Sequence, residues 1–361
     1  MPRFAFLNQQ NRTYIPSLDG IRAVAAMLVF VAHAGWMDIV PGGFGVTIFF
    51  FLSGYLITTL LRREFEYTGS ISFSKFYLRR AYRIFPPLYI VLILIFFLAV
   101  MGVVEHHMHV DAVLSQIFFW TNYYNLAYGA TGDYFVPTTG VSWSLAVEEH
   151  FYFIFPLVFL MVLRRMNYAG MARIFFLFCA IALLWRCWLV LGLNLPAAYT
   201  YSATDARFDS LLYGCILGVW RNPVFEPEWK FSLRPLAALL IAVILLLITF
   251  VLRDETFRAT LRYTMQGVAL FPIFWLAIRY SEWPIFSWLN WPFVRYLGAI
   301  SYTFYLSHGM ALIFAGHLVA EKVPRAMLGF VFTFLFSTLM YVLVEHPLAK
   351  YRQQLHGDST T

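Results

Sequence analysis

The sequence predicts an all-α integral membrane protein with about ten transmembrane helices in one bundle around a central cavity. Hydrophobic residues make up 61% of the 361 residues and charged residues only 12%, about half the charged fraction of a soluble globular chain. Apolar segments of membrane-spanning length follow one another with short gaps along the whole chain. We therefore expect a single transmembrane domain over residues 1–361, with short cytoplasmic tails at about 1–16 and 347–361.

The apolar segments give ten candidate spans. The second and the sixth are short or interrupted by glycine, so they could be re-entrant or broken. The candidate spans are residues 17–38, 44–61, 84–104, 142–163, 173–193, 207–220, 235–252, 263–280, 296–318 and 327–344. The longest stretch between spans, residues 105–141, is rich in aromatic residues, and we expect it to fold back onto the outer membrane face.

The distribution of Lys and Arg predicts the orientation of the chain. The loops on the side of the two termini are rich in these residues, whereas the opposite loops are poorer, with Arg253, Arg258 and Arg262 as the main exception. The positive-inside rule therefore places both termini in the cytoplasm. The net charge of +7 does not indicate nucleic-acid binding, because the basic residues cluster at the ends of the spans.

Arg22 and His33 lie eleven residues apart in the first apolar span. Eleven steps of 100° end about 20° past three full turns, so both side chains share one face of the helix, roughly 16 Å apart along its axis. Ionisable residues inside a membrane span are rare and usually functional. One cation near the cytoplasmic face and one imidazole toward the outer third predict a path for an anionic molecule with a reactive end.

Glu148 lies near the outer end of the fourth span, at a depth comparable to that of His33. A charge at mid-bilayer costs about 3 kcal/mol or more, so we expect these two side chains to pair. A carboxylate partner keeps an imidazole in one tautomer and raises its basicity, as a general base requires. The alternative is a buried polar pair that only joins two helices.

Two further groups of polar residues each allow a functional and a structural interpretation. Arg79, Arg80 and Arg83 can bring at least two guanidinium groups together for phosphate binding, or they only anchor a helix end. Arg207 and Asp209 are equally compatible with a structural ion pair and a substrate contact.

Other candidates have a preferred reading. For Tyr305 and His308, core hydrogen bonding is favoured over a site role. The step from Ser53 to Gly54 is typical of close helix packing, and a role for Ser53 as an acylated nucleophile is the minority reading. The loop histidines His106, His107 and His109 match no zinc pattern, so we expect no metal site.

These segments together resemble acyltransferase family 3, whose members are integral membrane proteins. The resemblance covers nearly the whole chain in the expected order, and the ordered set of motifs is specific although each one is weak. The matching stretches run from Ser17 to His33, Phe49 to Ile57, Arg79 to Pro86, Ser142 to Tyr152 and Ser301 to His308. The family's Arg and His separated by ten residues match Arg22 and His33, its Arg-x-x-Arg matches Arg80 and Arg83, and its Glu matches Glu148.

The resemblance implies transfer of an acyl group, usually acetyl, from cytoplasmic acyl-CoA to a hydroxyl of an extracytoplasmic glycan or glycoside. It also implies a bacterial inner (plasma) membrane, no tightly bound cofactor, and the stand-alone form without an SGNH domain, with a periplasmic partner as an option. We expect His33 and Glu148 to be catalytic, and Arg22, Arg80 and Arg83 to bind the phosphates of CoA. The expected substrate-binding residues are Trp143, Arg207, Asp209, Tyr305 and His308. The main alternative is a proton- or anion-coupled transporter that uses the same charges.

Overall fold

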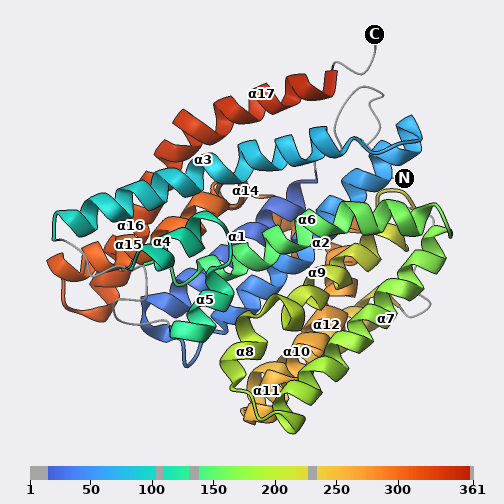
Figure 1. The fold of residues 1–361 in the computed structure, drawn as a ribbon, viewed down its shortest axis with the longest axis horizontal. Coiled ribbons are helices and arrows are strands. Elements are labelled where there is room, and N and C mark those ends of the chain that lie inside the picture. Colours follow the sequence, from blue (N-terminus) through green and yellow to red (C-terminus); the bar gives the residue numbers. More distant parts are fainter. Residues whose placement is uncertain (1–14, 103–108, 130–137, 227–233, 358–361) are drawn as a thin grey trace.

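The computed structural model describes residues 15–102, 109–129, 138–226 and 234–357, with side chains up to residue 351. Every element in these ranges is a helix (Figure 1), which confirms the predicted all-α class. The first half of the chain forms α1 (Pro16–Val31), α2 (Gly42–Thr68), α3 (Phe73–Val100), α4 (Val110–Ile117), α5 (Thr121–Tyr128), α6 (Ser142–Leu163) and α7 (Tyr168–Cys187). The second half forms α8 (Ala197–Ser202), α9 (Thr204–Val219), α10 (Pro235–Val251), α11 (Glu255–Ala259), α12 (Leu261–Arg279), α13 (Pro284–Ser287), α14 (Pro292–Ala299), α15 (Ser301–Leu318), α16 (Lys322–Met340) and α17 (His346–Gly357).

The number of membrane-spanning helices is smaller than predicted. Within the described residues, seven helices are long and apolar enough to cross a membrane, or eight if α14 and α15, bent by 74°, form one span. All ten predicted segments coincide with helices, but α10 has 17 residues and α9 has 16. Both are shorter than the roughly 20 residues of a typical straight span, so by length and composition the described residues support seven or eight of the about ten predicted spans.

α2 and α9 pack closely against each other in the centre of the bundle. α2 runs unbroken for 27 residues, so it is not the re-entrant segment that its glycines allowed. A Cβ atom at Gly54 would overlap the carbonyl oxygen of Leu211, and one at Gly214 would overlap that of Phe51. The two backbones can approach this closely only because neither glycine has a side chain, which confirms close packing at the step from Ser53 to Gly54.

α1 ends at Val31, two residues before His33. A π-helical turn, Ala32–Trp36, follows α1, and Gly35 within it has φ 109°. The side chain of Lys322 from α16 passes over Gly35 where a Cβ would lie, and its Nζ lies 4.6 Å from the centre of the Trp36 ring. Glycine is therefore required here both for the backbone angle and for space, and π-helical turns occur frequently at functional sites.

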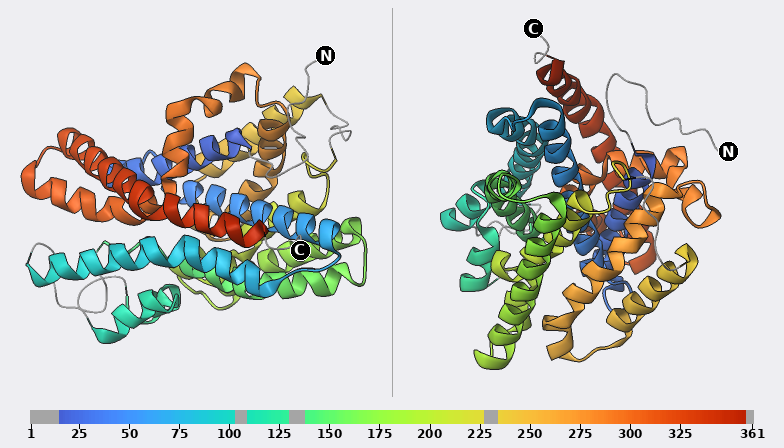
Figure 2. Two further views of the ribbon diagram at one scale, coloured as in Figure 1. Left: turned by 90° about the horizontal axis from the view of Figure 1, so that it is seen from above. Right: turned by 90° about the vertical axis from the view of Figure 1, so that its right-hand side faces the viewer.

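The C-terminal helix continues past the residues at which the sequence suggested that it ends. α16 passes through a π-helical turn, Tyr341–Glu345, directly into α17. α17 lies beside α3 in both views of Figure 2, and the rings of Tyr82 and Tyr351 pack with centroids 5.5 Å apart. The backbone from residue 347 to Gly357, within the segment that we expected to form a short tail, is thus helical.

The described part of the loop 105–141 forms the short helices α4 and α5, which pack on the bundle. Tyr123 of α5 donates a hydrogen bond of 2.7 Å to Asp205 of α9, and Trp185 of α7 donates to the same carboxylate, also at 2.7 Å. Burial, followed by the neighbouring Asp205, raises the pKa of Tyr123 to about 12. The phenol therefore stays protonated at neutral pH and holds α5 against α7 and α9.

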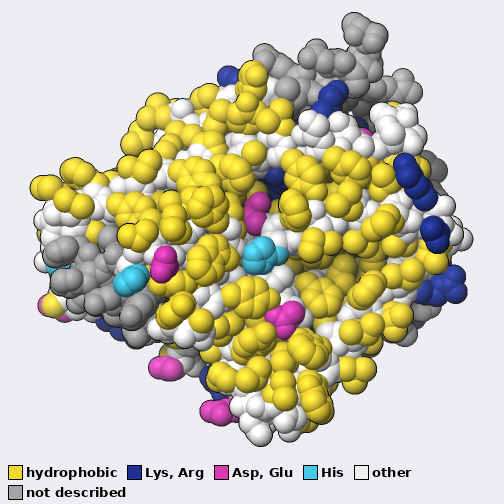
Figure 3. All heavy atoms as spheres, in the orientation of Figure 1, with side chains coloured by type: hydrophobic (Ala, Val, Ile, Leu, Met, Phe, Trp, Pro, Cys, Tyr) yellow, Lys and Arg dark blue, Asp and Glu magenta, His cyan; other side chains and the backbone are white. Residues whose placement is uncertain are grey.

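The outer surface of the helix bundle is apolar. Hydrophobic side chains cover most of the face in Figure 3, and Lys and Arg gather mainly at its right-hand rim. Large exposed apolar side chains occur along the spanning helices, for example Ile93 and Phe97 on α3 and Leu184 on α7. An apolar belt of this extent requires a lipid environment, which agrees with the multi-pass membrane protein that the composition predicts.

Candidate functional site

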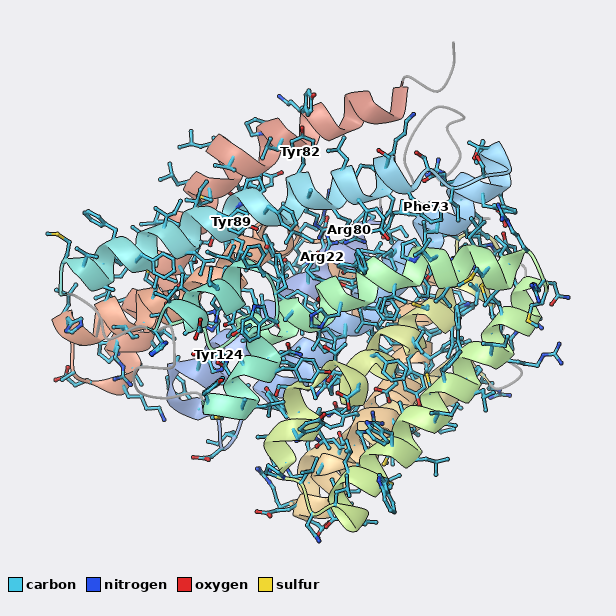
Figure 4. The ribbon with its side chains drawn as sticks, viewed as in Figure 1. Arg22, Phe73, Arg80, Tyr82, Tyr89 and Tyr124 are labelled. Carbon is cyan, nitrogen blue, oxygen red and sulfur yellow. The ribbon has the colours of Figure 1, made fainter. Side chains whose placement is uncertain are left out.

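A cavity of about 760 Å³, including space open to solvent, lies between α1, α2, α3, α6 and α15. Figure 4 shows Arg22 of α1 and Arg80 of α3 in the same central region of the bundle. Five of the ten predicted site residues line this cavity, namely Arg22, Arg80, Arg83, Glu148 and Tyr305. Segments that are far apart in the sequence therefore meet at one cavity, but the other five predicted site residues, including His33, do not line it.

The guanidinium groups in the cavity are held in different ways. Nη1 of Arg22 lies 3.0 Å from Oδ1 of Asp19 on the same helix. Cζ of Arg80 lies 4.2 Å from the centre of the Tyr152 ring, and no carboxylate among the described residues lies within ion-pair distance of it. Arg79 instead pairs with Glu64 at 3.1 Å and does not line the cavity. Of the three arginines at the start of α3, Arg80 and Arg83 therefore supply the charge of the cavity.

Glu148 has hydrogen-bond partners other than the one we expected. Its Oε2 accepts a bond of 2.6 Å from Tyr152 and one of 3.1 Å from Ser53. No bond joins it to His33 among the described residues, so the predicted pair of imidazole and carboxylate is wrong. A common depth in the bilayer does not determine which lateral neighbour a side chain meets.

The partner of His33 is His308. Nδ1 of His33 lies 2.8 Å from Nε2 of His308, which joins the π-helical turn after α1 to α15. His308 is 1% exposed, whereas the side chain of His33 is exposed. Neither ring lines the cavity, so the predicted base lies outside the cavity that holds the predicted phosphate-binding arginines.

Tyr305 connects the cavity to this histidine pair. Tyr305 lines the cavity, its hydroxyl lies 2.8 Å from the hydroxyl of Ser144, and its ring centroid is 5.9 Å from that of His308. Its carbonyl oxygen lies 2.7 Å from Nδ1 of His308. One residue of α15 thus contacts both parts of the candidate site.

Arg207 and Trp143 form a separate cluster that does not line the cavity. Arg207 is fully buried, and its Cζ lies 3.9 Å from the centre of the Tyr263 ring and 5.8 Å from that of Trp143. It donates to the hydroxyl of Thr47 at 3.2 Å. The charge is thus stabilised by aromatic faces, the Thr47 hydroxyl and the carbonyl oxygen of Tyr201, and no carboxylate among the described residues forms an ion pair with it.

Asp209 does not pair with Arg207 but with Arg186 of α7. Nη2 of Arg186 lies 2.7 Å from Oδ2 of Asp209, and both side chains are 0% exposed. The geometry therefore favours the structural alternative for Asp209. Arg186 was missed in the sequence, although an arginine well inside the apolar segment 173–193 is the same signal that identified Arg22.

The described residues contain no group of three or more His, Cys, Asp or Glu side chains that could hold a metal ion. His106 and His107 lie outside the described residues. His109 is exposed, and its Nδ1 lies 3.8 Å from Oδ2 of Asp111.

Fold and site together define a polytopic all-α membrane protein with a cationic cavity in its bundle. Residues 15–342 match the acyltransferase domain family over most of the chain, and the protein belongs to this family. No solved structure matches it.

The chain is similar to three curated bacterial proteins. The peptidoglycan O-acetyltransferase OatA of Listeria monocytogenes is 28% identical over 94% of this chain. The O-acetyltransferase OatA of Staphylococcus aureus strain NCTC 8325 is 29% identical over 93%. A protein of S. aureus strain COL, provisionally named an O-acetyltransferase, is 27% identical over 96%. The chain spans 56–59% of the length of these relatives.

Proposed function

We propose that the protein is a membrane-embedded O-acyltransferase that moves an acetyl group from cytoplasmic acyl-CoA to a hydroxyl of an extracytoplasmic glycan. The observation that carries the proposal is the convergence of Arg22, Arg80 and Arg83 on one cavity in a chain of an acyltransferase family. The names of the relatives support an acetyl group and an oxygen acceptor.

The cavity is suited to the anionic part of the donor. CoA carries a pyrophosphate and a further phosphate, and guanidinium groups bind phosphate oxygens by paired, charge-assisted hydrogen bonds. Arg80 has no carboxylate within ion-pair distance among the described residues, so binding a phosphate would not require it to break an ion pair. Glu148 acts through Tyr152, which it holds beneath this guanidinium.

The transfer step uses His33 as the general base. Nε2 of the imidazole takes the proton of the acceptor hydroxyl while the oxygen attacks the carbonyl carbon of the thioester. The new bond joins carbon to oxygen, the bond from carbon to sulfur breaks, and the leaving thiolate takes up the proton from the imidazolium. His33 is exposed, as a base that meets an acceptor from the outer side must be.

The acceptor that we propose to test first is peptidoglycan, because one relative is named for it. The purified protein in detergent is given radiolabelled acetyl-CoA and soluble peptidoglycan fragments. Release of the CoA thiol and label on the fragments are then measured together. We expect both signals from the wild type, whereas a transporter would produce neither.

The role of the base is tested with His33→Ala. We expect transfer to fall about 100-fold or more, the usual contribution of a general base, with expression and membrane insertion unchanged. His317→Ala is the matched control, since His317 is an exposed histidine near the outer end of α15, and it should retain activity. Near-normal transfer by His33→Ala would falsify the scheme.

A further inference from the structure

The two histidine rings meet edge to edge. Their planes are parallel within 4° and their centroids are 5.0 Å apart, while Nδ1 of His33 and Nε2 of His308 are only 2.8 Å apart. Rings stacked face to face would keep their atoms about 3.5 Å or more apart. The short distance is therefore a hydrogen bond in a shared ring plane, the geometry in which an N–H group points at the lone pair of its partner.

The direction of this bond follows from the other nitrogen of His308. Nδ1 of His308 lies 2.7 Å from the carbonyl oxygen of Tyr305, and a carbonyl oxygen can only accept. Nδ1 of His308 therefore carries a proton. In a neutral imidazole the second nitrogen is then an acceptor, so Nε2 of His308 accepts the bond from His33.

His308 is held in the neutral form by its surroundings. It is 1% exposed, and no carboxylate among the described residues lies within ion-pair distance of it. A second proton on its ring would place an uncompensated charge in the protein interior, which is strongly unfavourable. Lys322, the charged side chain packed against the turn that contains His33, is itself a cation and would disfavour a positive charge further.

We propose that His308 is a positioning residue that fixes the tautomer of His33. Nδ1 of His33 donates to His308, so Nε2 of His33 is left without a proton and available to accept one from a hydroxyl. This inference rests on the proposed function, in which His33 is the base. It assigns to His308 the orienting role that the sequence suggested for Glu148.

The hydrogen bond from His33 to His308 also favours the transfer of a proton from the acceptor hydroxyl to His33. When Nε2 of His33 gains a proton, the ring becomes an imidazolium and its bond to the lone pair of His308 becomes charge-assisted and stronger. Tyr305 extends the effect to the cavity, since its carbonyl oxygen accepts a hydrogen bond from His308 and the residue lines the cavity. The orientation of the base thus depends on the same helix residue that contacts the cavity.

Two substitutions of His308 by amide side chains distinguish a positioning role of this residue from a packing role. In His308→Gln the terminal amide reaches the place of Nε2, so its oxygen can still accept from His33. In His308→Asn the shorter amide reaches only the place of Nδ1, so it keeps a bond to Tyr305 but leaves His33 without a partner. We expect kcat with acetyl-CoA and peptidoglycan fragments to fall about 100-fold or more in His308→Asn and to stay within about 10-fold in His308→Gln. KM for acetyl-CoA should be unchanged in both.

A spectroscopic measurement reads the tautomer in the wild-type protein, and a variant is needed only to assign the signals. In protein labelled with ¹⁵N at histidine, the signals of His33 are identified by comparison with His33→Ala, and their shifts distinguish protonated from unprotonated ring nitrogens. We expect a protonated Nδ1 and an unprotonated Nε2. The opposite tautomer, or equal kcat in the two His308 variants, would overturn the inference. Activity retained in His33→Ala would instead overturn the proposed function.

Discussion

Tyr152 donates a hydrogen bond of 2.6 Å to Oε2 of Glu148, the shorter of the two that this oxygen accepts. The ring of the same tyrosine lies beneath Arg80, 4.2 Å from Cζ of the guanidinium. Both residues of the pair lie on α6, four positions apart, and both line the cavity. One phenol therefore fixes an acid and a cation of the site at the same time.

Removing this hydroxyl should weaken binding of the donor. Tyr152→Phe keeps the ring beneath Arg80 but removes the donor to Glu148, and a hydrogen bond to a charged group contributes about 1.5–3 kcal/mol. We expect KM for acetyl-CoA to rise about 10-fold, with kcat changed much less. The control is Tyr77→Phe, which removes a bond of 2.7 Å from α3 to the carbonyl oxygen of Phe153 on α6, outside the cavity. Equal KM values in the two variants would contradict the link from Glu148 to Arg80.

Adjacent arginines on α3 should respond differently to the same change. Arg80→Lys keeps the positive charge but loses the planar group that binds phosphate through two parallel bonds, so we expect KM for acetyl-CoA to rise about 10-fold or more. Arg79→Lys alters a residue that pairs with Glu64 and does not line the cavity, so its KM should stay near the wild-type value. Steady-state kinetics at fixed ionic strength give both numbers. A larger effect at Arg79 than at Arg80 would show that the cavity does not bind the phosphates.

The residues of the cavity could be predicted because charge in an apolar segment has few explanations. Arg22 and Glu148 each interrupt a span, and the cost of exposing them to lipid requires that they face the bundle interior. The spacing of Arg80 and Arg83 is equally compatible with phosphate binding and with a helix anchor, and the family resemblance decided between the two. Hydropathy also located the helices, and α6 begins and ends at the predicted residues, Ser142 and Leu163. The prediction of the buried charges and the prediction of the helix positions both depend on the local sequence and on the thickness of the bilayer.

The partners of these residues could not be predicted. Position along the sequence gives the depth of a side chain, but the rotation of each helix and the order of helices around the bundle depend on packing between distant segments. Glu148 was therefore paired with His33 at the same expected depth, although Ser53 and Tyr152 are its partners. Similarly, Asp209 bonds to Arg186 on a neighbouring helix rather than to Arg207 in its own.

The pair of Arg186 and Asp209 should matter for stability. Replacing one partner leaves the other as an uncompensated charge in the interior, and breaking a buried pair in this way costs about 3–5 kcal/mol. We therefore expect Asp209→Asn and Arg186→Met each to lower the thermal midpoint of the detergent-solubilised protein markedly. The double variant Arg186→Met with Asp209→Leu should recover most of the loss. A substrate contact at Asp209 predicts instead a normal midpoint with a raised KM for the glycan acceptor.

The close contact of α2 and α9 gives a prediction that does not depend on the catalytic scheme. In Gly214→Ala the new methyl group would overlap the carbonyl oxygen of Phe51, so the two central helices must separate, and overpacking of this kind costs about 1–3 kcal/mol. In Gly316→Ala the nearest atom to the new methyl group is Cδ of Arg325, 3.4 Å away at the end of a flexible side chain. Thermal unfolding in detergent should therefore show a lowered midpoint for Gly214→Ala and an unchanged or slightly raised one for Gly316→Ala, because alanine is favoured over glycine within a helix. If both variants unfold at the wild-type temperature, the backbones of α2 and α9 are not in contact.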